Sequence, residues 1–156
     1  MRTLPITASD EEIKQLVRDW VGLLAEEKYA QAVDMIAAEI PEGSGSVDSR
    51  QVIAWTPELL QNVISNYGIP EPWEGQEQVY RVVPIAAAFE ELFEDLLKVD
   101  RDDDFQDDDA DIGMIHVDLP LNYVEDDGLS DLTARFDLCR INKNEMVLVL
   151  HDIHVL

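Results

Sequence analysis

Apolar residues recur at helical spacing in three segments of the N-terminal half of the chain. The first segment follows Ser9, which forms a capping-box pattern with Glu12. The second spans about 28–40. The third follows Thr56, an N-cap residue with proline at the next position, and Gly68 is suited to its C-terminal end. The pattern predicts three helices that each bury one apolar face.

The middle of the chain combines a short β pattern with a longer amphipathic one. Residues 79–83 are typical of a strand, and Pro84 ends it. Residues 85–99 place apolar side chains at helical intervals among glutamates and lead directly into an aspartate-rich stretch. We interpret 85–111 as an acidic insertion within a single domain that covers 1–156.

The C-terminal third alternates polar and apolar residues with the period of a strand. Residues 115–123 and 132–139 follow this period, and 142–145 have the composition of a hairpin turn. Residues 146–150 are almost continuously apolar, as in a strand that is covered on both faces. Because helices come first and an antiparallel meander comes last, the predicted class is α+β.

This order of elements resembles the nuclear-transport-factor-like superfamily, also called the cystatin-like cone. The resemblance is carried by the N-terminal helices with Trp20 and Tyr29 and by the strands of 115–156. Segments 130–133 and 152–156 are also similar to an uncharacterised bacterial domain family. The resemblance implies a curved antiparallel sheet around a long helix. It implies no single activity, since the superfamily contains isomerases, dehydratases, hydrolases and non-catalytic partner-binding proteins.

Charge restricts the partners that we expect. The chain carries 34 acidic and 11 basic residues, a net charge of −23, and eight aspartates fall within 100–111. This sign opposes nucleic acid and anionic membranes, and it favours a basic protein or, at most, weakly held divalent cations. The only cysteine, Cys139, cannot form an internal disulfide. Together with the lack of a signal peptide or an apolar span, this favours a soluble cytoplasmic protein without a cofactor.

The aspartate-rich stretch has three interpretations. The first is a solvated, self-repelling loop. The second is a calcium loop, because four aspartates occupy positions one, three, five and twelve, although Phe105 replaces the glycine needed at position six. These candidate metal ligands are Asp100, Asp102, Asp104 and Asp111. The third is mimicry of a nucleic acid towards a basic partner. The candidate partner-binding residues are Asp102, Asp103, Asp104, Asp107, Asp108 and Asp109.

Histidines supply the remaining candidate chemistry. His116 and Asp118 share one strand face, as do two charged residues, Arg135 and Asp137, on the next strand. If these strands pair, the four residues form a polar patch, either an acid–base site in a pocket or a solvent-facing set of ion pairs, which we favour. The spacing of His151 and His154 predicts opposite faces of a regular strand.

We therefore expect a non-enzymatic protein-binding module, immunity-like or inhibitor-like towards a basic partner, or a homodimer formed through the sheet. The alternative is a pocket protein of the same fold that binds a small ligand or acts as a lyase or isomerase. In that case Trp20, Tyr29 and Phe136 would line the cavity. His116 or Asp118 would then be the catalytic polar group.

Overall fold

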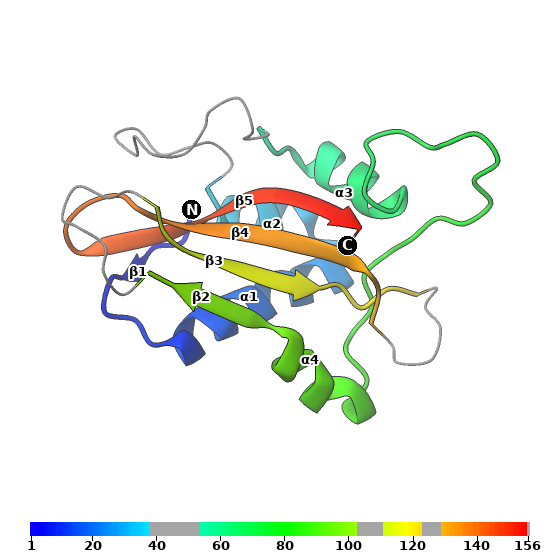
Figure 1. Ribbon diagram of the computed structural model, residues 1–156. Coiled ribbons are helices and arrows are strands. Elements are labelled where there is room, and N and C mark those ends of the chain that lie inside the picture. The colour runs from blue at the N-terminus through cyan, green and yellow to red at the C-terminus, as the bar shows by residue number, and fades with distance from the viewer. Residues whose placement is uncertain (38–53, 103–110, 123–128, 156) are drawn as a thin grey trace.

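The computed structural model describes residues 1–37, 54–102, 111–122 and 129–155. Four α-helices pack against a curved, five-stranded antiparallel sheet with the strand order β1-β5-β4-β3-β2 (Figure 1). The strands are β1 (Leu4–Pro5), β2 (Lys98–Arg101), β3 (Asp111–Asp118), β4 (Leu132–Arg140) and β5 (Glu145–Val155). The helices are α1 (Asp10–Ala25), α2 (Tyr29–Met35), α3 (Pro57–Ser65) and α4 (Glu90–Leu96), the last preceded by a 3₁₀ turn, η2 (Ala87–Phe89). The predicted α+β class, with helices packed on a curved sheet in a cone-like arrangement, is confirmed.

The predicted helix starts are confirmed in detail. The Ser9 hydroxyl oxygen accepts a hydrogen bond from the Glu12 amide at 3.2 Å, so it satisfies one of the free N–H groups at the start of α1. At α3 the Thr56 hydroxyl oxygen accepts from the Leu59 amide at 3.1 Å, and Pro57 is the first helical residue. Both starts therefore follow from local sequence alone.

The ends of α1 and α3 place a residue other than glycine in the left-handed region. Glu27 follows α1 with a φ of 59°, and Tyr67 follows α3 with a φ of 55°. One residue later, the Lys28 amide donates to the Leu23 carbonyl at 2.9 Å, and the Gly68 amide donates to a carbonyl of α3 at 2.8 Å. These are Schellman ends. The C-cap of α3 is Asn66, not the predicted Gly68, and Tyr67 and Gly68 follow it with positive φ angles.

Glu27 offers a test of this helix end. We expect Glu27→Gly to raise the free energy of unfolding by about 1 kcal/mol, because glycine adopts a positive φ without the steric cost that other residues meet. Glu26→Gly is the matched control, since Glu26 has a φ of −89° and gains nothing from glycine. Urea denaturation of both variants measures the difference. Equal effects of the two substitutions would contradict the assignment.

Two predicted elements in the middle of the chain are wrong. Residues 79–83 form no strand, and only Val82 makes a bridge, to Leu121. The predicted helix of 85–99 is shorter, since α4 ends at Leu96 and the chain becomes strand β2 at Lys98. The pairing with β3 overrides the helical periodicity, because a short segment takes its structure from its tertiary partners. The predicted second helix also ends early, at Met35, and residues 38–40 lie outside the described ranges.

The acidic stretch joins two neighbouring strands. β2 and β3 pair antiparallel with Arg101 opposite Gly113, and the Asp102 amide donates to the Ile112 carbonyl at 3.0 Å. Arg101 also fixes this corner to the start of α1, since its guanidinium donates to the carbonyl of Ala8 at 2.6 Å. The base of the acidic stretch is therefore anchored both to the sheet and to α1.

The core lies between α1 and the inner face of the sheet, which we define as the face that carries Phe136. Trp20 of α1 contacts Phe136 of β4 edge to face, with the ring centroids 4.8 Å apart, and both side chains are fully buried. The opposite face of the sheet, called the outer face below, is partly covered. There Ala37 packs with Cys139 and with Val147 and Val149 of β5.

Candidate functional site

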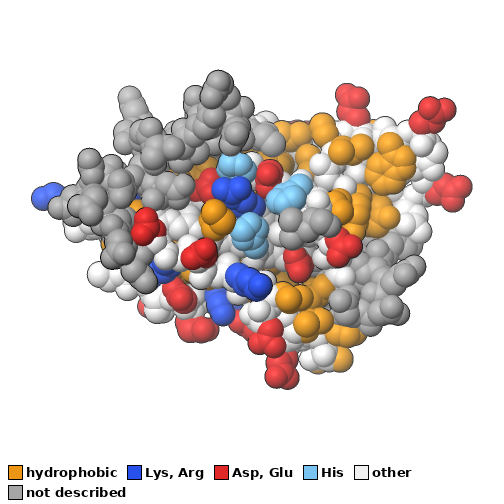
Figure 2. Space-filling view, viewed as in Figure 1, with side chains coloured by type: hydrophobic (Ala, Val, Ile, Leu, Met, Phe, Trp, Pro, Cys, Tyr) orange, Lys and Arg blue, Asp and Glu red, His pale blue; other side chains and the backbone are white. Residues whose placement is uncertain are grey.

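The outer face of the sheet gathers the chain's three histidines with charged side chains. Strand register places these residues in two rows across β3, β4 and β5: His116, Arg135 and Asp152, and then Asp118, Thr133 and His154. Figure 2 shows the histidines close together on this face, with blue cationic and red carboxylate side chains around them. The polar patch predicted for β3 and β4 is thus present, because the two strands pair in the required register.

A β-bulge in β5 brings the C-terminal histidines onto this face. Phe136 pairs with Leu150, but the next residue of β4, Arg135, pairs with Asp152, so His151 is an extra residue in β5. The extra residue reverses the alternation beyond it. The prediction that His151 and His154 lie on opposite faces is therefore wrong, because it assumed a regular strand.

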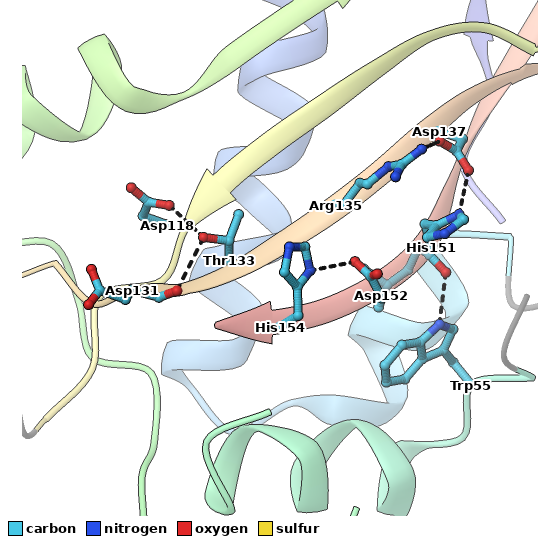
Figure 3. A network of polar contacts seen from close by, with 10 residues as sticks. Trp55, Asp118, Asp131, Thr133, Arg135, Asp137, His151, Asp152 and His154 are labelled. Carbon is cyan, nitrogen blue, oxygen red and sulfur yellow. Dashed lines mark hydrogen bonds and ion pairs between the residues drawn. The ribbon is translucent and has the colours of Figure 1, made fainter. Parts of the chain in front are cut away.

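Trp55 holds the bulge from the side of α3. Its indole Nε1 donates to the Leu150 carbonyl at 2.8 Å, and the ring is buried (Figure 3). Trp55 directly precedes Thr56, the N-cap of α3, so the start of the helix and the bulge are fixed together. A buried carbonyl beside an irregular strand position needs such a partner. Composition and spacing gave no sign of this contact.

The most buried charged group of the site is the Asp137 carboxylate. Its side chain is 3% exposed, and its Oδ2 lies 3.0 Å from Nδ1 of His151, whose side chain is 14% exposed. Its Oδ1 lies 3.5 Å from Nη2 of Arg135. A buried carboxylate needs such partners, since an unpaired one is costly to keep out of water. The arrangement holds the His151 ring in place, and the Arg135 side chain, whose contact with Asp137 is drawn in Figure 3, is partly exposed.

The two carboxylates that belong to the rows, Asp152 and Asp118, also have partners. Asp152 lies 2.8 Å from Nδ1 of His154, and each of these side chains is more than a third exposed. Asp118 accepts a hydrogen bond from the Thr133 hydroxyl at 2.8 Å. The exposed pair contributes little to stability, and its importance lies in the pattern that it presents to solvent.

The candidate catalytic pair, His116 and Asp118, lies on this outer face and is half-buried. The candidate pocket residues lie on the other side of the sheet. Trp20 and Phe136 pack against each other in the core, and Tyr29 is buried nearby. Burial, and secondarily the charge of Glu27, raises the pKa of the Tyr29 phenol above its ordinary value, so it stays protonated at neutral pH. The two predicted halves of an active site are thus on different faces.

An open groove of about 530 Å³ lies elsewhere, against the exposed side of α1. Its lining includes Gly22 and Ala25 of α1 and the segment from Val83 to Ile85. Trp20, Tyr29 and Phe136 are absent from its lining. The groove and the outer face are therefore separate features.

Most of the candidate partner-binding residues, Asp103, Asp104, Asp107, Asp108 and Asp109, lie outside the described ranges, whereas Asp102 is described and exposed. The first and last candidate calcium ligands, Asp100 and Asp111, belong to two paired strands. Within the described ranges, no three His, Cys, Asp or Glu residues lie close enough together to hold a metal ion.

Comparisons with known proteins found no matching protein family, curated protein or solved structure. In the part of the chain that the structure describes, no helix is long and apolar enough to cross a membrane. The outer face of the sheet and the charge of the chain are therefore the features that bear on its function.

Proposed function

We propose that this chain is a non-enzymatic protein-binding module whose binding surface is the outer face of the sheet. The observation that carries the proposal is the position of the polar residues. His116, Arg135 and His154 lie on an exposed or half-exposed sheet surface, and the inner face is filled by core side chains. Polar groups fixed by hydrogen bonds on an accessible sheet suit recognition of another surface.

The partner that we propose is a protein with a basic surface. A net charge of −23 accelerates encounter with such a partner and disfavours acidic ones. The charge of the acidic stretch, including Asp102 to Asp109, would add to this attraction. The same reasoning supports an immunity-like or inhibitor-like role, in which the partner's basic surface is masked.

A pocket enzyme of the same fold is less well supported by the geometry. His116 and Asp118 would need to face the space between α1 and the sheet, where Trp20 and Phe136 already pack. General acid–base groups act best in a site that excludes water.

The buried Cys139 fits the reducing cytoplasm that we propose as the compartment.

Site-specific photo-crosslinking in cells of the native host tests the proposal. Met114 is half-buried on the outer face beside His116, so a photoreactive phenylalanine analogue at this position would sample the proposed surface without removing a charge. Ala30, which is exposed on α2 in the helical layer, is the control position. We expect a basic protein to be trapped from position 114 and not from position 30. After purification, that protein should bind this chain with an affinity at least about tenfold lower when the salt concentration rises from 0.05 to 0.5 M.

Three results would overturn the proposal in this form. Trapping of the same protein from both positions would remove the outer face as the surface. A trapped protein that is acidic would remove the electrostatic argument. A crosslink between two copies of this chain would instead establish the homodimer through the sheet, with no basic partner required.

A further inference from the structure

Three basic side chains lie side by side on the outer face, one on each of three neighbouring strands. Lys98 of β2 is directly opposite His116 of β3, and His116 is directly opposite Arg135 of β4. Neighbouring strands are about 4.8 Å apart, so the row spans about 10 Å. We call Lys98, His116 and Arg135 the basic row.

The basic row has donors without acceptors. Among the described residues, the side chains of Lys98 and His116 make no hydrogen bond or ion pair, and Lys98 is exposed whereas His116 is half-buried. Arg135 uses only Nη2, at the long distance of 3.5 Å from Asp137, and its Nε has no acceptor. Donors that are partly removed from water and left without acceptors favour the binding of an external acceptor.

Three carboxylates on β3, β4 and β5 around the basic row are already engaged, whereas Asp100 of β2 is exposed. Asp118 is bonded to Thr133, Asp137 to His151, and Asp152 to His154. Asp152 is the register neighbour of Arg135, yet its recorded contact is with His154. The chain thus provides acceptors for its other outer-face donors and, within the described ranges, leaves Lys98, His116 and the Nε of Arg135 without side-chain acceptors. This is unexpected in a protein with three times more acidic than basic residues.

We propose that the basic row is a binding site for an oxyanion, either a carboxylate or a phosphate group. Arg135 supplies a planar fork of N–H donors, which suits two oxygens of one group. Lys98 supplies a mobile ammonium from the opposite end of the row, and the His116 ring donates from the centre. The proposal does not depend on the proposed function, because a free anion can occupy the site without any protein partner.

The overall charge limits the affinity without removing the site. Charges on the exposed surface are screened over about 8 Å at physiological ionic strength, so an anion above His116 interacts mainly with the basic row and with its nearest carboxylates. Because those carboxylates are paired, their repulsion is reduced. A free anion should bind in the millimolar range, and the site should prefer an anion presented on a larger ligand.

Histidine ring signals in ¹H–¹³C NMR spectra give a direct test. The uniformly labelled protein is titrated with sodium phosphate, sodium acetate or sodium chloride at pH 7.5 and constant ionic strength. We expect a saturable shift of the His116 ring signal with phosphate, acetate or both, and none with chloride. Lys98→Gln should weaken the binding about fivefold or more, and Arg135→Gln should weaken it further, because the bidentate donor is lost.

The control is Arg81→Gln, which removes an exposed cation on another segment and should leave the titration unchanged. Lys98→Gln keeps the test valid if Arg135→Gln disturbs the fold, because Lys98 is exposed and makes no described polar contact. Binding of acetate alone assigns a carboxylate site, binding of phosphate alone a phosphate site, and binding of both a general oxyanion site. A shift that chloride reproduces, or one that Lys98→Gln and Arg81→Gln change equally, would overturn the proposal.

Discussion

Deletion of His151 should leave the protein folded, whereas deletion of Val149 from the same strand should unfold it. His151 is the extra residue of the bulge, so its removal lets Leu150 and Asp152 keep their partners on β4 in a regular ladder. The expected cost is about 1–3 kcal/mol, because the buried Asp137 carboxylate loses its imidazole partner.

Val149 lies in the regular part of the ladder, so the strand has no extra residue there to replace it. Its removal shifts the following residues by one position, which turns Leu150 to the outer face and His151 towards Phe136 in the core. Absorbing the deletion at the hairpin turn instead would turn Met146 and Leu148 outward. Either outcome costs an amount comparable to the whole stability of a domain, about 5 kcal/mol or more. Urea denaturation and amide NMR spectra of both variants measure the contrast, and equal destabilisation would contradict the bulge assignment.

Phe136→Ala should lower the free energy of unfolding by about 3–5 kcal/mol. The ring is fully buried and packs edge to face on Trp20, so its removal leaves a cavity that the sheet and α1 cannot close. Trp73→Ala is the matched control, since the Trp73 side chain is exposed and its loss should change stability by about 0.5 kcal/mol or less.

The same measurement separates a packed core from a ligand cavity. If Phe136 lined an open pocket, its truncation would enlarge an existing space and would remove few contacts. A cost below about 1 kcal/mol for Phe136→Ala, similar to that of the Trp73 control, would therefore revive the pocket alternative. Thermal and urea denaturation of both variants give this comparison.

Local signals in the sequence predicted the helix starts and the C-terminal strands. Ser9 and Thr56 cap their helices through side chains only three residues from their partners, so no distant information was needed. Strict alternation in β3 and β4 likewise placed His116 and Arg135 on the correct face. Short-range rules therefore accounted for these two helix starts and for the part of the candidate site that lies on β3 and β4.

The remaining features depend on contacts between distant parts of the chain. Lys98 and Val99 end the helical pattern of 85–99, yet they belong to strand β2 because β3 offers a partner and the Arg101 guanidinium bonds to the carbonyls before α1. The bulge at His151 has no composition signal and is fixed by Trp55, which lies 95 residues from Leu150 in sequence. Alternation alone therefore placed His154 on the face opposite to His151.

The charge of the chain and the structure of its outer face have distinct roles in this account. The acidic stretch between β2 and β3 is attached at a corner of the sheet, where Asp102 bonds to Ile112. The outer face adds an ordered set of partnered carboxylates and a basic row in which the side chains of Lys98 and His116 have no acceptor among the described residues. The charge of the chain alone selects only the sign of the partner's charge, whereas the register of the strands defines the surface that the partner would contact.

The bulge in β5 places all three histidines on one accessible face of the sheet. Nuclear Overhauser contacts between β4 and β5 in the labelled protein test it most directly. We expect contacts that place Phe136 opposite Leu150 and Arg135 opposite Asp152. The rings of His151 and His154 should both contact outer-face residues of β4. Contacts that pair Arg135 with His151 and Ala134 with Asp152 would show a regular strand and would contradict the claim.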